Sequence, residues 1–398
     1  MVKFVKNNKS VISLTSMIMI FFSTHATLAQ LNNPWEISVD SDMPDITTIK
    51  PNETGERRVP LLRKVQKIWD ESLSGLPYNA FTDLIRFNDC WYCTFREGEV
   101  HEWSDAGGIR ILKSKDGNVW KSVALLRWNE GDLRDPKFSI TAEGQLMVNS
   151  AVIFKPPETP LYFKINSLVW LSPDGENWSS SYSCRTGINS WRWSVTWNKG
   201  LGFSLAYHGK DSKGTLYMTT DGKTWEVLAE NIFPCGKGNE ASIDFGENDK
   251  AYCLLRDGPG GMAHIGVAKP PYNDWKWTDL GMYAGGPEIK RLKDGRLLAV
   301  VRLHEGGLPP SATMPGLSSN LGGGRTSLCW IDPNKGLMKE FLTLPSGGHG
   351  GHSYAGIVEY EGMIWISYYS SHENTTEKQR PAIYLAKVKL DKKKNTSE

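Results

Sequence analysis

A short motif occurs three times in this chain of 398 residues and restricts its fold more than any other feature of the sequence. It reads SKDGNVW at residues 114–120, SPDGENW at 172–178 and TTDGKTW at 219–225. The shared pattern is Ser or Thr, any residue, Asp, Gly, two further residues and Trp. The Asp accepts hydrogen bonds from turn amides, the Gly adopts a positive φ, and the Trp folds back over the hairpin. Each copy therefore predicts a tight turn between two strands.

Short strand-like segments rich in β-branched and aromatic residues fill the chain from about residue 62 onward. FTDLIRF, KAYCLLR and MIWISYYS are examples, and Gly, Asp and Asn separate such segments. Helical periodicity is nearly absent, and only LLRKVQKIWDES is expected to form a helical turn or two. A repeat of roughly 50 residues made of four short strands is typical of a β-propeller blade.

We therefore expect an all-β fold, a six-bladed β-propeller between residues 79 and 390. A seventh blade is expected if the segment before residue 79 contributes strands of its own. The C-terminal segment AIYLAKVKL is expected to close the ring by pairing with N-terminal strands. The predicted organisation is a signal peptide at 1–29, an irregular segment at 30–62, a single propeller domain at 63–390 and a polar tail at 391–398.

The N-terminal segment has the pattern of an export signal. A basic stretch, MVKFVKNNK, precedes the apolar run SVISLTSMIMIFF and the small residues of STHATLAQ, with a cleavage site expected after Ala29. The apolar run is too short for a transmembrane helix, which needs about 20 residues, and no later stretch is expected to span a membrane. We expect an exported protein, periplasmic or extracellular.

Composition excludes some classes of function. The formal net charge is only +2, so no basic field favours nucleic acid. The 16 Trp residues suit both a sheet core and the stacking of sugar rings. We expect buried thiols rather than disulfides or a zinc site, and no cofactor, because no nucleotide-binding or metal-binding motif is present. The six cysteines are Cys90, Cys93, Cys184, Cys235, Cys253 and Cys329.

The repeated motif resembles the Asp-box, or BNR repeat, of sialidase-type β-propellers, and the resemblance extends over residues 79–390. In the segment GNEASIDFGENDKAYCLLRDG, Glu240 precedes Arg256 as a Glu precedes a carboxylate-binding arginine in sialidases. Arg325 in GGRTSLCW and Tyr354 in SYAGIVEY resemble the later arginine and the tyrosine that attacks the sugar. The resemblance implies that Glu240 orients Tyr354 or an arginine.

The chain departs from the sialidase pattern at one place. Sialidases have Arg-Ile-Pro on the first strand, whereas residues 80–87 here read AFTDLIRF, with Arg86 displaced along the strand. Histidines occupy other positions expected near the axis. They are His101, His208, His349 and His352.

A propeller with His, Tyr and Arg at its centre also resembles the propeller-type polysaccharide lyases, such as ulvan lyases, which act on uronic acids. Elimination needs a base for the proton α to a carboxylate, and cations that neutralise that carboxylate. The resemblance implies Arg256 and Arg325 as the neutralising pair, His101 as base and Tyr354 as acid or second base. His208 or His352 is expected to assist either role.

Two further arginines are candidates for substrate binding. Arg302, with His304 in VVRLHEGG, ends a strand and could bind sulfate or carboxylate. Arg134, in LRDP, belongs either to a structural turn between blades or to the lining of the site.

Three functions remain open from the sequence. The favoured hypothesis is a carbon–oxygen lyase, a polysaccharide lyase or an oligosaccharide dehydratase, acting on an acidic, uronate-containing glycan that could also be sulfated. The second is a sialidase-type glycoside hydrolase with Asp105 as the acid and Glu240 with Tyr354 as the nucleophilic pair. The third is a propeller that binds glycans without catalysis.

Overall fold

The computed structural model describes residues 61–128, 131–154, 164–208, 212–257, 262–304, 324–348, 351–376 and 378–390. The predicted signal peptide, most of the irregular N-terminal segment, the polar tail and His349 lie outside these residues. In the described part of the chain, no helix is long and apolar enough to cross a membrane.

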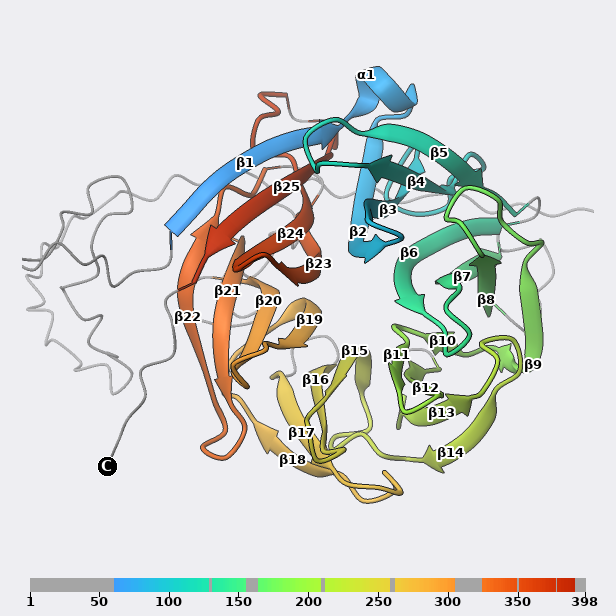
Figure 1. Cartoon of the computed structure of the whole chain (residues 1–398), viewed down its shortest axis with the longest axis vertical. Coiled ribbons are helices and arrows are strands. Elements are labelled where there is room, and N and C mark those ends of the chain that lie inside the picture. Colours follow the sequence, from blue (N-terminus) through green and yellow to red (C-terminus); the bar gives the residue numbers. More distant parts are fainter. Residues whose placement is uncertain are drawn as a thin grey trace, which may run out of the picture. The chain divides into compact units, whose positions relative to one another are not determined.

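Six antiparallel sheets are arranged around a ring in Figure 1, which confirms the prediction of a six-bladed propeller. The first sheet contains β2 (Tyr78–Phe87), β3 (Cys90–Gly98), β4 (Gly108–Ser114) and β5 (Lys121–Leu126). The second contains β6 (Gly131–Ile140), β7 (Leu146–Phe154), β8 (Ile165–Ser172) and β9 (Tyr182–Ile188). The third contains β10 (Trp191–Arg192), β11 (Thr196–Asn198), β12 (Leu201–Tyr207), β13 (Thr215–Thr219) and β14 (Glu226–Glu230). The fourth contains β15 (Gly238–Phe245), β16 (Ala251–Asp257), β17 (His264–Ala268) and β18 (Lys276–Asp279). The fifth contains β19 (Gly285–Arg291), β20 (Leu297–Leu303), β21 (Arg325–Asp332) and β22 (Leu337–Leu344). The sixth contains β23 (Ser353–Tyr360), β24 (Met363–Ser370), β25 (Ala382–Lys389) and β1 (Leu61–Trp69).

The last blade closes the ring, as expected from the C-terminal segment. Strand β1 pairs antiparallel with β25 and forms the outer strand of this blade. The expectation of a helix over LLRKVQKIWDES was therefore wrong for its first part, because pairing with β25 outweighs the weak local preference. Only α1 (Glu71–Ser74) is helical, with Asp70 as its N-cap. The alternative of a seventh blade is also wrong, since the described segment before residue 79 adds mainly this one strand.

The three repeated motifs form the predicted turns between the last two strands of each of the first three blades. In each turn an Asp Oδ1 accepts two backbone N–H groups, at 2.9 and 3.2 Å for Asp116, 2.8 and 2.7 Å for Asp174, and 2.8 and 2.8 Å for Asp221. The three glycines have φ values of 71°, 78° and 72°. These hydrogen bonds hold the pKa of each Asp below its usual value.

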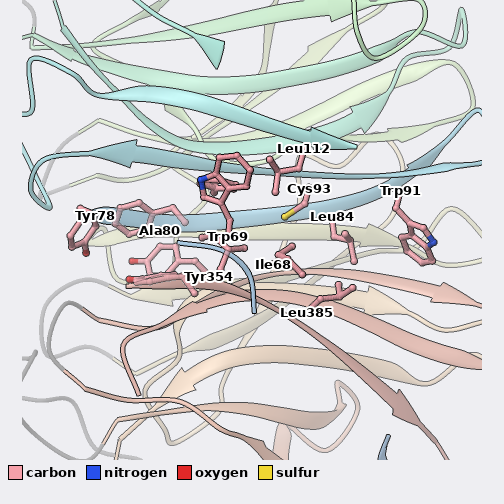
Figure 2. Close-up of a cluster of buried hydrophobic side chains, with 14 of the residues drawn as sticks. Ile68, Trp69, Tyr78, Ala80, Leu84, Trp91, Cys93, Leu112, Tyr354 and Leu385 are labelled. Atoms are coloured by element: carbon pink, nitrogen blue, oxygen red, sulfur yellow. The ribbon is translucent and has the colours of Figure 1, made fainter. Parts of the chain in front are cut away.

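The hydrophobic core lies between and within the blades. One cluster joins the first and last blades, and Figure 2 places Tyr78 and Tyr354 toward one end of it and Trp91 at the other. None of the six cysteines, which all lie in the described part of the chain, forms a disulfide; Cys93, Cys253 and Cys329 are buried, as predicted, whereas Cys235 is exposed. Burial raises the pKa of the three buried thiols.

Two glycines allow a test of the turn geometry. Gly175, in the second repeated motif, and Gly144 share a φ of 78°. A Cβ on Gly175 would lie 2.5 Å from the buried Tyr92 ring, whereas a Cβ on Gly144 would meet nothing within 4 Å. We expect Gly144→Ala to lower the free energy of unfolding by about 1 kcal/mol, the cost of a left-handed L-residue. Gly175→Ala should cost roughly 1–3 kcal/mol more because of the clash. Urea titration of both variants measures the difference, and equal losses would contradict the close packing of Gly175 against Tyr92.

Candidate active site

One extra residue interrupts the innermost strand in five of the six blades. The register shifts by a β-bulge near the start of each of these strands, which lie closest to the axis in Figure 1. The shifts lie between Ala80 and Asp83, Arg134 and Lys137, Gly238 and Ala241, Gly285 and Glu288, and Ser353 and Gly356. A bulge bends its strand and redirects side chains, and bulges are frequent beside active sites.

These bulges surround a cavity of about 300 Å³ at one end of the ring. Residues from all six blades or the loops that follow their strands contribute to it. The lining consists of Phe81, His101, Glu102, Arg134, Asp135, Ile153, Trp191, Tyr207, Glu240, Arg256, Arg302, Tyr354 and Tyr369. Aromatic rings and charged groups dominate this list, which is the composition expected of a site for a polar ligand with an apolar face.

Glu240, Tyr354 and Arg256 form a hydrogen-bonded group inside the cavity. The Tyr354 hydroxyl donates to Glu240 Oε1 at 2.6 Å, and Arg256 Nη1 donates to the same oxygen at 2.7 Å. The other oxygen, Oε2, accepts the backbone N–H of Gly286 at 2.8 Å. Arg256 Nη1 also lies 3.3 Å from the Tyr354 hydroxyl. The structure thus joins Tyr354 to two residues that lie 98 and 114 positions earlier in the sequence.

The charges of this group favour an ionised Glu240. Burial acts to raise the pKa of Glu240, but Arg256 and the hydrogen bonds outweigh it and lower that pKa. Burial and the negative charge of Glu240 raise the pKa of Tyr354 well above its usual value. A neutral phenol that donates to a carboxylate can transfer its proton to that carboxylate when the phenol oxygen attacks an electrophile.

The backbone at Tyr354 is strained. Ser353 and Tyr354 have φ values of 82° and 50°, although neither residue is glycine. The Tyr354 ring lies edge-on to Phe81 at 4.9 Å between centroids, and the Arg302 guanidinium lies 5.5 Å from its ring centre. Strain of this kind costs about 1–3 kcal/mol for each residue and is concentrated at functional sites.

Asp135 supplies a second carboxyl group of different character. It is buried, its Oδ1 has no hydrogen-bond partner among the described residues, and its φ is 45° although Pro136 follows it. Burial raises its pKa to about 7, with Arg134 opposing and Glu240 reinforcing the shift. Two carboxyl groups with pKa values pushed apart indicate an acid and a base. The interpretation of LRDP as a turn between blades was wrong, because these residues belong to β6.

Three guanidinium groups face the cavity. Arg134 lies 5.2 Å from the ring centre of Phe81, and its Nη1 is 3.9 Å from the exposed Glu102 carboxylate. Arg256 is paired with Glu240. Arg302 makes no ion pair or hydrogen bond with the residues that the structure describes. A partly buried cation without a partner favours an anionic ligand.

His101 lies at the rim of the cavity. A 2.6 Å hydrogen bond joins its Nδ1 to the Tyr78 hydroxyl, and its Nε2 is 3.6 Å from Glu102 Oε1. Burial lowers the pKa of His101 to about 3, and Arg134, Arg96 and Arg302 act in the same direction. The imidazole is therefore neutral near pH 7.

The structure does not bring three other predicted residues to the lining. Arg325 forms a two-hydrogen-bond pair with Glu340, at 2.8 and 2.6 Å, on the outer strand β22. His208 is engaged by the Asn189 carbonyl at 2.9 Å and the Thr215 hydroxyl at 3.2 Å. His352 is buried close to Gly324, and it is not among the residues that line the cavity.

Two residues weighed as sialidase equivalents also lie elsewhere. Arg86 packs over the rings of Trp91 and Tyr360, at the other end of β2. Asp105 is exposed in the loop between β3 and β4.

Several lining residues escaped the sequence analysis. Asp135 adjoins the predicted Arg134, and a carboxyl group between that arginine and Pro136 was the available signal. Trp191 and Tyr207 stack at 5.5 Å between ring centroids and form an aromatic wall from the third blade. Phe81 and Tyr369 complete the aromatic lining. Nothing local distinguishes these aromatic residues from the many that fill the core.

The raised pKa of Asp135 predicts a pH-dependent stability. Between its ordinary pKa of 3.8 and the folded value of about 7, the folded state holds a proton that the unfolded chain releases. The stability contributed by this group is therefore present below pH 3.8 and is lost as pH rises to 7, at up to about 1.4 kcal/mol per pH unit. Asp135→Asn removes this pH dependence. The free energy of unfolding of the variant, measured in urea from pH 4.5 to 7.5, should rise relative to that of the wild type. A constant difference between the two proteins would contradict the assignment.

Comparison with known proteins returns structural relatives only. No protein-family model and no curated protein matches the chain. A Dyadobacter fermentans protein of unknown function is 17% identical with a TM-score of 0.62, covering 84% of this chain and 99% of that one. The Penicillium chrysogenum α-L-arabinanase complexed with arabinobiose is 12% identical with a TM-score of 0.56, covering 83% and 98%. The Streptococcus pneumoniae NanB sialidase is 11% identical with a TM-score of 0.60, covering 85% and 72%. At these identities the likeness shows the fold alone, and the chain shares a six-bladed β-propeller fold with these proteins.

Proposed function

We propose that the protein is a glycoside hydrolase that releases an acidic sugar from a glycan, with Tyr354 as its nucleophile. The observation that carries this proposal is the 2.6 Å hydrogen bond from the Tyr354 hydroxyl to Glu240 Oε1, which Arg256 also contacts. The arrangement supplies a nucleophile with an adjacent base, and the base is oriented by a third group. The likeness to a sialidase and an arabinanase supports action on carbohydrate.

The proposed reaction has two steps. In the first, Tyr354 Oη bonds to the anomeric carbon while its proton passes to Glu240, and protonated Asp135 gives its proton to the leaving glycosidic oxygen. In the second, the Asp135 carboxylate takes a proton from water, which attacks the anomeric carbon and releases the tyrosine. The tyrosine regains its proton from Glu240. One water is consumed, and the configuration at the anomeric carbon is retained.

The charge of the cavity supports an acidic substrate. Arg134, Arg256 and Arg302 face Glu240 and an Asp135 that is half protonated near pH 7. The three cations therefore exceed the buried anions, and Arg302 is available to a carboxylate or sulfate on the sugar. Guanidinium groups bind such planar or multidentate anions well. The aromatic wall of Trp191 and Tyr207 offers a face for the apolar side of the ring.

Elimination on a uronate is the second candidate, because His101 supplies a neutral imidazole at the same cavity. Its Nε2 could take the proton α to the sugar carboxylate while an arginine neutralises that carboxylate, and the glycosidic oxygen would leave with a proton from Tyr354 or Asp135. No water is consumed. The raised pKa of Asp135 suits the acid of either reaction, whereas Glu240 as a base for an attacking Tyr354 has a role only in the first.

The site of action is proposed from the N-terminal signal pattern in the sequence. Export to the periplasm or the exterior would place the enzyme where glycans of other cells and of the environment are found.

Product mass separates the candidates. The purified protein is incubated with sialosides and with uronate-containing oligosaccharides, with and without sulfate, and the products are read by mass spectrometry. Hydrolysis adds about 18 Da to the summed fragments, a water mass, as expected for the main proposal. Chain cleavage without added mass would show a lyase, and loss of water without cleavage a dehydratase. Binding without any product would overturn both proposals and favour a glycan-binding propeller.

Substitutions then assign the residues. Tyr354→Phe and Asp135→Asn should each lower kcat/KM by about 10²–10⁴-fold, the usual contribution of a positioned acid, base or nucleophile. Asp105→Asn, an exposed carboxyl group outside the cavity, is the matched control and should retain activity. If elimination is the reaction, His101→Ala becomes the most damaging change. Full activity of Tyr354→Phe would rule out the proposed nucleophile.

A further inference from the structure

A layer of polar residues lies directly beneath the cavity, at the positions that end the five bulges. Its members are the first regularly paired residues after each bulge, or neighbours of them. They are Asp83, Lys137, Ser242 and Glu288, and Gly356 lies at the corresponding position of the last blade. Gly356 allows two strands to meet here, because a Cβ on it would lie 2.1 Å from the Leu84 nitrogen and 2.5 Å from Asp83 Oδ1. The layer is therefore compact and built on the same bulges as the site above it.

Lys137 links three blades within this layer. Its side chain is buried, and its Nζ donates to Glu288 Oε2 at 2.9 Å on β19. The same Nζ donates to the backbone carbonyl of Ala355 at 3.1 Å on β23. Ser242 donates to the other Glu288 oxygen at 3.2 Å. Burial acts to lower the pKa of Lys137, but Glu288 and Asp83 outweigh it and raise that pKa, so the ammonium stays charged.

Thr82 and Lys137 hydrogen-bond to the backbone at Tyr354 and at the residue that follows it. The Thr82 hydroxyl donates to the Tyr354 carbonyl at 2.9 Å, one peptide before the carbonyl that Lys137 holds. Consecutive carbonyls of Tyr354 and Ala355 are thus both fixed from other blades. A left-handed conformation at two successive non-glycine residues persists only when its surroundings hold it.

The charge of Lys137 also acts on the carboxyl groups around it. Burial raises the pKa of Asp135 and the pKa of Asp83, each to about 7, and the positive charge of Lys137 acts to lower both values. The charged groups facing Lys137 are Asp83 on β2, Asp135 on its own strand and Glu288 on β19. One ammonium therefore holds the backbone carbonyl of the residue that follows the proposed nucleophile and acts on the pKa of the proposed acid.

We propose that Lys137 is a positioning residue, which holds the Tyr354 bulge in its reactive conformation through the Ala355 carbonyl and carries its positive charge on the strand that bears Asp135. This inference rests on the proposed function of the site. It adds a residue that is not among those lining the cavity and was not identified from the sequence.

The test replaces the buried ion pair as a unit. Lys137→Met alone would leave the part-buried Glu288 without its cationic partner, so it is combined with Glu288→Met, a neutral pair of similar volume. We expect kcat to fall on the order of 10²-fold, because the nucleophile loses its fixed geometry, while KM changes by less than about 3-fold. Lys290→Met is the control, since Lys290 lies on β19 but pairs with Asp244 at 3.7 Å, outside the cavity.

The pH profile is the readout that a merely structural role would not move. Asp135 must be protonated to act as the acid, so kcat/KM falls as pH rises through its pKa near 7. Loss of the Lys137 charge raises the pKa of Asp135, and the alkaline limb should move up by roughly 0.5–1 pH unit. Lys137→Gln with Glu288→Gln also lacks the charge and should show the same shift. This second pair keeps the test open if the Met pair does not fold.

The two proposals fail in different ways. An active wild type together with an unchanged kcat and alkaline limb in the Met pair would overturn the role of Lys137 alone. A wild type without product on any glycan would overturn the proposed function. In that case crystal structures of the Met pair and of the wild type still test whether Lys137 holds the backbone at Tyr354. The inference requires that Tyr354 loses its positive φ in the variant or that the segment around it becomes disordered. An unchanged, ordered Tyr354 backbone would overturn the inference.

Discussion

The extra residue in each of five innermost strands is the constraint on which the rest of this structure depends. A regular strand would alternate its side chains between the two blades beside it and direct none of them along the axis. The bulges break this alternation at one end of the ring, and there Phe81, Asp135, Glu240 and Tyr354 reach a common cavity. The same bulges end at the polar layer of Lys137 and Glu288. The cavity and the polar layer next to it therefore both arise from the same bulges.

Charge is arranged in two levels along the axis. In the upper level, Arg256 pairs with Glu240, while Arg302 has no partner among the described residues. In the lower level, Lys137 pairs with Glu288. Buried ions are tolerated when they are paired and hydrogen-bonded, and an unpaired one marks a place for a ligand. The upper level therefore contains a cation without an ion-pair partner among the described residues, and it is also the level with a cavity.

The sequence identified only part of the site. Some site residues lie in short segments that can be recognised locally, whereas the place of others depends on how distant strands pack. Glu240, Arg256 and Tyr354 could be assigned from a resemblance in short segments, and the structure joins them by hydrogen bonds. Arg325 and Arg302 could not be ranked in the same way. Arg302 lies on β20, and Arg325 pairs with the next residue, Leu303, from the strand farther from the axis. Because Arg325 lies one strand farther from the axis, it pairs with Glu340, whereas Arg302 reaches the cavity.

The sequence by itself determined the blades. Asp116, Asp174 and Asp221 each cap a turn through bonds to residues two and three positions away, so the repeat and the propeller could be recognised locally. Only the tertiary structure decided which residues meet at the axis. The pKa of Asp135, the strain at Tyr354 and the hydrogen bond from Lys137 to Ala355 arise from groups up to 272 positions apart in the chain. Burial and charge at the centre of a ring depend on all six blades together, and no short stretch of sequence contains that information.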